Sequence, residues 1–183
     1  ASNNVAVGYA SLGANTTGAS NTAVGRESLF NNTTGGSNIA LGLNALYANT
    51  TGGANVAVGK DALKANTTAS NNTAVGYQSQ EATTTGANNS SFGLHALRLN
   101  TTGSSNVAVG SAALETNTTG ANNVAIGFTA VSGNTTGGEL VGIGNGALLT
   151  NTTGAFNVAV GSASLQLNTT GASNTAVGRF ALR

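Results

Sequence analysis

Apolar and small residues recur along this chain with a period of 17 residues, which identifies an internal repeat. Phrases such as N-V-A-V-G at 55–59 combine an asparagine, an alternating apolar run and a glycine. The glycine returns in eleven copies without insertion or deletion. It is found as Gly8, Gly25, Gly42, Gly59, Gly76, Gly93, Gly110, Gly127, Gly144, Gly161 and Gly178. We take this glycine as column 0 of the repeat and count the other columns from it.

The repeat predicts an all-β fold, a parallel β-solenoid of eleven coils. Seventeen residues are too few for a helical hairpin, which needs more than about 30. The alternating β-branched run that ends at a glycine is typical of a short strand followed by a turn. We expect two short strands in each coil, at the V-A-V and Thr-Thr segments, and a rod roughly 50 Å long from a coil spacing of about 4.8 Å. The strict period fits this fold, because one inserted residue would turn a strand face inside out.

Five nearly invariant columns indicate how each coil is built. Column −4 is Asn in ten copies, and we expect its carboxamides to form a ladder along the rod. Column +4 is Leu in nine copies, and columns +7 to +9 read Asn-Thr-Thr in nine of the ten complete copies. In one coil we expect Ile39 and Leu41 to pack, Ala40 to allow close approach, Asn38 to join the ladder and Leu46 to plug the interior.

The composition is that of a low-complexity structural protein. Only 6% of the residues are charged, against roughly 25% in ordinary globular domains. The net charge of +1 gives no basic field for nucleic acid or anionic lipid. The absence of Cys excludes a disulfide framework, and no apolar run approaches the ~18 residues of a membrane span. We expect residues 1–183 to form a single repeat array, a segment of a longer fibrous protein.

Charged residues occupy few columns, which indicates the outer surface. Ten of the eleven lie in columns +1, +2 and +5. They are Arg26, Lys60 and Arg179 in column +1, Glu27 and Asp61 in column +2, and Lys64, Glu81, Arg98, Glu115 and Arg183 in column +5. We expect these columns to face solvent, because an unpaired buried charge is costly.

The strand columns −4 to −1 carry no charge on either face, so we expect both faces to be covered. The coil interior would cover one face and a sister chain the other. The apolar side chains of one coil are also too few to offset the entropy of ordering it. These two observations favour a homotrimer over a single-chain solenoid, with a stacked filament as the other form of self-association.

The phrases N-V-A-V-G at 55–59 and 106–110 and N-V-A-I-G at 123–127 resemble the head repeats of trimeric autotransporter adhesins. The resemblance covers all eleven copies and implies a left-handed parallel β-roll, three chains wide. The coil of those heads is shorter, since the N-T-T-G segment lengthens each coil here. Phrases of the type N-T-A-V-G followed by N-T-T-G also resemble repeats of phage tail-fibre proteins and of bacterial surface fibres.

Residues that could carry chemistry are few and lie far apart. Residues 142–147 match G-x-G-x-x-A, a dinucleotide-binding outline, but no crossover helix can follow within a 17-residue repeat. Glu27, Asp61 and His95 share column +2, two coils apart each, so successive members lie about 9.6 Å apart. Catalytic partners need contacts of about 3 Å. We therefore expect no enzyme activity, no cofactor and no metal site.

The Asn-Thr-Thr columns leave two further interpretations open. Regular Thr arrays can order water in ice-binding solenoids, although neighbours such as Thr16 and Thr17 would present one outward hydroxyl in an extended strand. The same triplets fit the N-x-[ST] rule for N-glycan acceptors, or a turn in which hydroxyls satisfy local amides. The acceptor asparagines would be Asn15, Asn32, Asn49, Asn66, Asn100, Asn117, Asn134, Asn151 and Asn168, and Asn31, Asn71, Asn88 and Asn89 also fit the rule.

These observations favour a non-enzymatic structural or adhesive rod of an extracellular fibre, which would give rigid extension and surface display. A bacterial surface adhesin or filament is the first expectation, a phage tail-fibre shaft the alternative, and an ice-binding solenoid the least favoured. The expected location is extracellular, on a cell surface or a virion. Besides self-association, a host or cell-surface receptor or glycan would be contacted through columns +1, +2 and +5.

Overall fold

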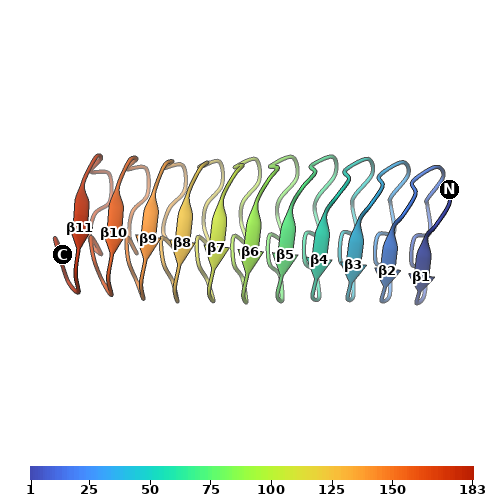
Figure 1. Ribbon diagram of the computed structural model, residues 1–183, viewed down its shortest axis with the longest axis horizontal. Coiled ribbons are helices and arrows are strands. Elements are labelled where there is room, and N and C mark those ends of the chain that lie inside the picture. Colours follow the sequence, from blue (N-terminus) through green and yellow to red (C-terminus); the bar gives the residue numbers. More distant parts are fainter.

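The computed structural model describes all residues from 1 to 183 and is an all-β parallel solenoid without helices (Figure 1). Each coil contributes one three-residue strand, and the eleven strands form one parallel sheet in sequence order along the rod. The strands are β1 Val5–Val7, β2 Thr22–Val24, β3 Ile39–Leu41, β4 Val56–Val58, β5 Thr73–Val75, β6 Ser90–Phe92, β7 Val107–Val109, β8 Val124–Ile126, β9 Val141–Ile143, β10 Val158–Val160 and β11 Thr175–Val177. The termini lie at opposite ends of the rod.

The register between neighbouring coils is the sequence period. In β7 and β8, for example, Val107 pairs with Val124 and Val109 with Ile126, and no strand pair departs from the 17-residue offset. The predicted solenoid is confirmed. The predicted second strand at Thr-Thr is wrong, because these residues form a bend. Thr118 N and Thr119 N both donate to the single carbonyl oxygen of Thr135, at 2.8 and 3.3 Å, so the alternation of a strand ladder is not kept there.

The interior lies on the small-residue face of the strand. Ala40 is fully buried, whereas Ile39 on the same strand is 40% exposed and Leu41 is half-buried. The expected packing of Ile39 and Leu41 therefore does not occur inside the coil. The space inside a coil is taken by buried leucines such as Leu46, as predicted, together with column −2 alanines and buried asparagines. The wider side chains of columns −3 and −1 point outward instead.

The column −4 asparagines form the expected ladder, but through the backbone. In the regular coils, the Oδ1 of Asn21 accepts a bond from the backbone N–H of Asn38 at 2.9 Å, one coil further on. Its Nδ2 donates to the carbonyl oxygen of Gly35 at 2.9 Å. Each carboxamide thus ties two coils together and satisfies a buried carbonyl. Leu140 interrupts this ladder, as the sequence shows, and its backbone N–H still donates to Asn123 at 2.9 Å.

A second asparagine ladder lies in column +7, and here the carboxamides bond directly to one another. Asn117 Nδ2 donates to Asn100 Oδ1 at 2.9 Å and to the Gly120 carbonyl at 2.9 Å, while its own Oδ1 accepts from Asn134 Nδ2 at 2.8 Å. All three asparagines are fully buried. The interior is thus stabilised by stacked amides as much as by apolar contact, and the coil is filled without a sister chain.

The corners of each coil use left-handed backbone at residues other than glycine. Ala112, Leu114 and Asn122 have φ values of 56°, 53° and 59°, and the corresponding residues of nearly all coils share this conformation. Such a φ costs roughly 1–2 kcal/mol per L-residue, a cost that the two asparagine ladders and the strand ladder offset. Column 0 needs glycine for a further reason. A Cβ on Gly110 (φ 130°) would lie 2.5 Å from the carbonyl oxygen of Gly127 in the next coil.

Candidate functional surfaces

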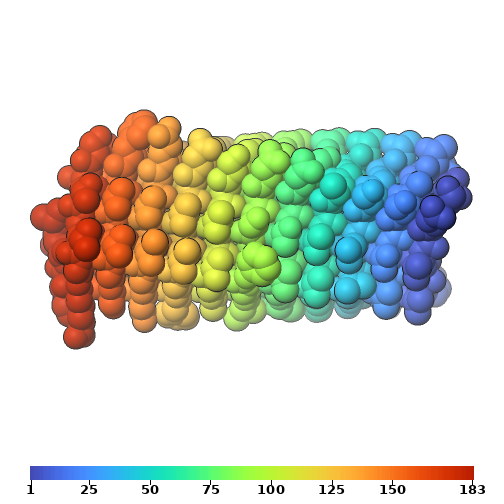
Figure 2. All heavy atoms as spheres, in the orientation of Figure 1, coloured from blue at the N-terminus to red at the C-terminus, as the bar shows by residue number.

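Side chains of corresponding positions form rows along the rod, and each row is a separate candidate surface (Figure 2). The outward rows are the charged columns, one threonine column and the outward face of the strands, while the acceptor asparagines lie mostly inside.

The charged columns lie at the surface, with one exception that corrects the expectation. Asp61 in column +2 is only 5% exposed. Its carboxylate accepts a bond from Asn44 Nδ2 at 2.9 Å and pairs with Lys64 Nζ at 3.5 Å. The charge is therefore covered but fully partnered, which is the condition under which a buried carboxylate is tolerated.

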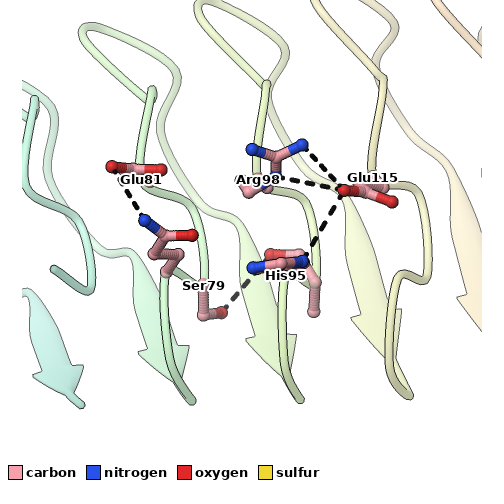
Figure 3. Close-up of polar contacts among 7 residues, drawn as sticks. Ser79, Glu81, His95, Arg98 and Glu115 are labelled. Carbon is pink, nitrogen blue, oxygen red and sulfur yellow. Dashed lines mark hydrogen bonds and ion pairs between the residues drawn. The ribbon is translucent and has the colours of Figure 1, made fainter. Parts of the chain in front are cut away.

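One set of charged and polar side chains lies on three successive coils (Figure 3), and its ion pairs join two of them. Arg98 donates to Glu115 Oε1 through Nε at 3.1 Å and Nη2 at 2.9 Å, and His95 Nδ1 lies 3.8 Å from the same oxygen. In the neighbouring coil Gln78 Nε2 donates to Glu81 at 3.4 Å. We call these five residues the charged cluster. Its members remain partly exposed, and each bond joins side chains on one coil or on adjacent coils.

The column +2 residues that could have formed a catalytic set are not brought together. Glu27 pairs with its neighbour Arg26 at 3.2 Å, Asp61 with Lys64, and His95 with Glu115. No pocket opens on the surface, and no group of three His, Cys, Asp or Glu side chains is arranged to hold a metal ion.

The G-x-G-x-x-A match has a packing explanation. Gly142 is the column −2 residue of β9 and is buried, and a Cβ there would meet the side chain of Val131. Val131 replaces the usual Leu of column +4, and Leu140 replaces the usual Asn of column −4. Gly142 therefore accommodates neighbouring substitutions in the core.

The two threonine columns differ in their hydroxyls. In column +8 the hydroxyl is bound to the next coil, as for Thr118 Oγ1, which donates to the Thr135 carbonyl at 2.9 Å. In column +9 the residues are exposed, and Thr119 and Thr136 are typical of them. The rod thus presents a single file of outward threonines, on a bend and not on the flat strand face.

The predicted N-glycan acceptors are mostly interior residues. From Asn32 to Asn151 the predicted acceptors are fully buried, and each Nδ2 donates hydrogen bonds within the column +7 ladder. Asn15 and Asn168 at the two ends are half-buried. A transferase that needs the free amide nitrogen could reach the buried members only before the coils form. Among the additional matches, Asn71 and Asn88 are exposed in the folded rod.

One coil has a polar interior. Gln80 takes the place of the plugging Leu, and its Nε2 donates to the Thr73 carbonyl at 2.9 Å and to Ser91 Oγ at 2.8 Å. Thr83 takes the place of the ladder Asn, so that Asn66 Oδ1 has no partner, and neither has Gln80 Oε1. These substitutions divide the apolar core into one cluster from Ala23 to Ala74 and another from Ala96 to Ala176.

The outward side of the sheet is apolar and uncovered. We call the residues of columns −3 and −1 the strand face. Column −1 consists only of Val, Leu, Ile and Phe, and column −3 mostly of Val with some Ile, Thr and Ser. Val24, Phe92, Val109 and Ile126 are 37–43% exposed. Along each strand, large residues of columns −3 and −1 alternate with a small residue of column −2. This alternation is the sequence signal for the outward direction of the large residues, because only small residues fit a coil already filled by asparagine and leucine.

No helix of the chain is long and apolar enough to cross a membrane. Comparison with protein-family models, with curated proteins and with solved structures gave no match, so the chain is described by its architecture: a parallel β-solenoid of 17-residue coils with internal asparagine ladders.

Proposed function

We propose that this chain is a non-enzymatic structural rod of an extracellular fibre, which sets a fixed distance and displays the outward columns along its length. The observation that carries the proposal is the continuity of bonding from coil to coil. Strand ladder, column −4 ladder and column +7 ladder run side by side along the rod. Such parallel networks resist bending and shear, as in other stacked parallel strands.

The distribution of sequence variation supports display. Interior columns repeat closely, whereas the outward columns +1, +2 and +5 vary from coil to coil and hold nearly all charges and several exposed aromatics, among them Tyr9, Tyr77 and Phe128. A receptor or glycan on a host or cell surface would be contacted there. Function is then adjusted on the outside while the interior keeps the rod straight.

The resemblance of N-V-A-V-G at 106–110 to adhesin-head repeats favours a bacterial surface adhesin or filament. A phage tail-fibre shaft is the second candidate, because the N-T-A-V-G phrase at 174–178 resembles tail-fibre repeats and a shaft makes the same mechanical use of continuous ladders.

The mechanical part of the proposal is tested by changing the number of coils. Deleting residues 94–110, one complete repeat, should shorten the rod by about 4.8 Å, and duplicating them should lengthen it by the same amount. Small-angle scattering would measure the maximum dimension. A flexible chain would instead change its dimension with about the square root of its length.

The biological part is tested by labelling the source material with antibody raised against the purified rod. Label on filaments that project from intact cells supports the adhesin or filament, and label on virion fibres supports the shaft. Label confined to the interior of permeabilised cells would contradict an extracellular role.

A further inference from the structure

We propose that the strand face is an interface on which a second copy of this chain packs, sheet against sheet. This inference rests on the proposed function of a fibre rod and names its partner. It starts from a face that is apolar and continuous over eleven strands in register. None of its 22 positions carries a charge, and 18 of them are Val, Leu, Ile or Phe.

The footprint of the strand face alone is about two-thirds of the area that each partner buries in a standard interface. Ten strand steps of about 4.8 Å by three residues of about 3.3 Å give a footprint of about 500 Å², and protruding side chains raise the accessible area above this value. Exposed apolar residues of column +1, such as Leu43, Leu94 and Phe128, widen the face on one side. Stable pairs bury about 800 Å² on each partner, whereas the largest apolar patch of a typical monomer is about 300–600 Å².

The periodicity of the face favours a second copy over an unrelated partner. Rows of side chains repeat at every strand, so grooves between rows recur at the spacing of the sheet. A partner surface can place its own rows of side chains in those grooves over the full length only if its rows have the same spacing. A second copy of this chain has that spacing, because its sheet is identical. Sheets that pack face to face lie about 10 Å apart, which suits outward Val and Ile side chains.

The columns that lie side by side across the strand face differ in composition. The middle column, −1, is apolar in all eleven coils. Column −3 on one side includes Thr22, Thr73, Ser90 and Thr175. Column +1 on the other side carries the nearest charges, and all of these are cations, Arg26, Lys60 and Arg179. The apolar centre thus lies between two borders of mixed composition, and polar residues at the borders are the usual anatomy of a specific interface.

The first test is the mass in solution at micromolar concentration, by analytical ultracentrifugation. We expect twice the chain mass of 17.6 kDa, about 35 kDa. The double variant Val109→Lys/Ile126→Lys should sediment as a single chain. Both positions are 37–38% exposed, so lysine can extend into solvent and the far-ultraviolet circular dichroism of the rod should not change.

The matched control is Thr119→Lys/Thr136→Lys, which adds the same charge on the same two coils at exposed column +9 positions. It should keep the mass of the pair. If both double variants gave single chains, net charge and not the strand face would control assembly, and the proposal would be overturned.

Cross-linking with a short bis-maleimide tests the face and its orientation, since the chain has no Cys of its own. Efficient linking of Val24→Cys to itself indicates parallel rods. Linking of Val24→Cys only to Val160→Cys, in a mixture, indicates antiparallel rods centred near Phe92. Either result supports the strand face, provided that Thr34→Cys on the exposed bend gives no comparable product.

Failure of this inference is distinguishable from failure of the proposed rod. Single chains of wild-type protein, absence of any strand-face cross-link, or a mass of three chains would overturn the pairwise interface. The coil-number dependence of the rod length would be unaffected by any of these results. A short or flexible particle in solution scattering would instead contradict the rod itself.

Discussion

The coil from Asn106 to Gly120 and the coil from Asn72 to Gly86 share one backbone but differ inside. In the first, Leu114 and Ala113 fill the core and Asn117 continues the amide ladder. In the second, Gln80 and Thr83 replace the equivalents of Leu114 and Asn117 and leave two buried oxygens without partners, yet β5 and β6 keep their register. The backbone ladders and the column −4 asparagines, which are intact in both coils, therefore keep the shape of a coil, and the other interior side chains decide how stable that coil is.

Breaking the regular coil should have the largest effect. Asn117→Ala removes three hydrogen bonds and leaves Asn100 Oδ1 without a side-chain donor inside the rod. We expect the free energy of unfolding to fall by about 3 kcal/mol, the combined effect of lost bonds and an unsatisfied buried group. Urea denaturation followed by circular dichroism would measure it. The matched Thr83→Ala, where the ladder is already interrupted, should cost less than about 1 kcal/mol, and an equal loss in the two variants would show that ladder continuity contributes nothing.

Replacing the polar interior residues of the altered coil by those of the regular coils should increase the free energy of unfolding. The double variant Gln80→Leu/Ser91→Ala restores the residue types of neighbouring coils and removes the unpartnered Gln80 Oε1. Because it joins the two apolar clusters, we expect an increase of about 2 kcal/mol in the free energy of unfolding. The midpoint of denaturation is the measurement. A decrease would mean that the bonds of Gln80 Nε2 to Thr73 and Ser91 stabilise this coil more than apolar packing would.

Repairing only the ladder should have the smallest effect. Thr83→Asn would donate to Asn66 Oδ1 and replace the long 3.4 Å contact between Asn100 Nδ2 and Thr83 with an amide bond. An increase of about 1 kcal/mol is expected, the net value of one buried hydrogen bond. Thr85→Asn, an exposed substitution two residues later, is the control and should leave the midpoint unchanged.

The period of the sequence predicts the solenoid, its register and the number of coils, because only a stacked fold keeps a 17-residue spacing without slippage. It does not predict which side of the strand is inside. Hydrophobicity predicts that Ile39 and Leu41 pack but not on which side, and the interior is already occupied by Leu46 and two layers of asparagine. Nor does it predict the corners. Leucine with φ near 50° is intrinsically unfavourable, and only the surrounding ladders hold Leu63 there.

The sequence predicts some of the candidate surfaces and not others, because part of each surface depends on contacts between coils. Column positions of charges identify the outer surface, although Asp61 shows that a corner column can be covered when Asn44 and Lys64 supply partners. The Asn-Thr-Thr triplets were interpreted as a strand, a turn or glycan acceptors, while the buried amide ladder of column +7 was missed. A local motif does not distinguish these alternatives, since the ladder exists only between coils.

The homotrimer expected from the sequence and the pair proposed here differ in the number of chains. The sequence favours the trimer because a single coil contains few apolar side chains and because the strand columns carry no charge on either face, and the asparagine ladders account for the first of these observations. What remains is an uncovered apolar face on one side of each rod. Measured mass separates the two assemblies directly, at about twice or three times 17.6 kDa.

The invariant offset between coils has a consequence for heredity. Every coil bonds to neighbours that are almost interchangeable with it, at an offset of 17 residues throughout. Recombination between repeats of the gene would therefore add or remove whole coils and leave each new junction correctly bonded. The number of coils, and with it the length of the rod, can therefore change by whole coils in a single generation. A point mutation in the interior, by contrast, destabilises the core and is selected against.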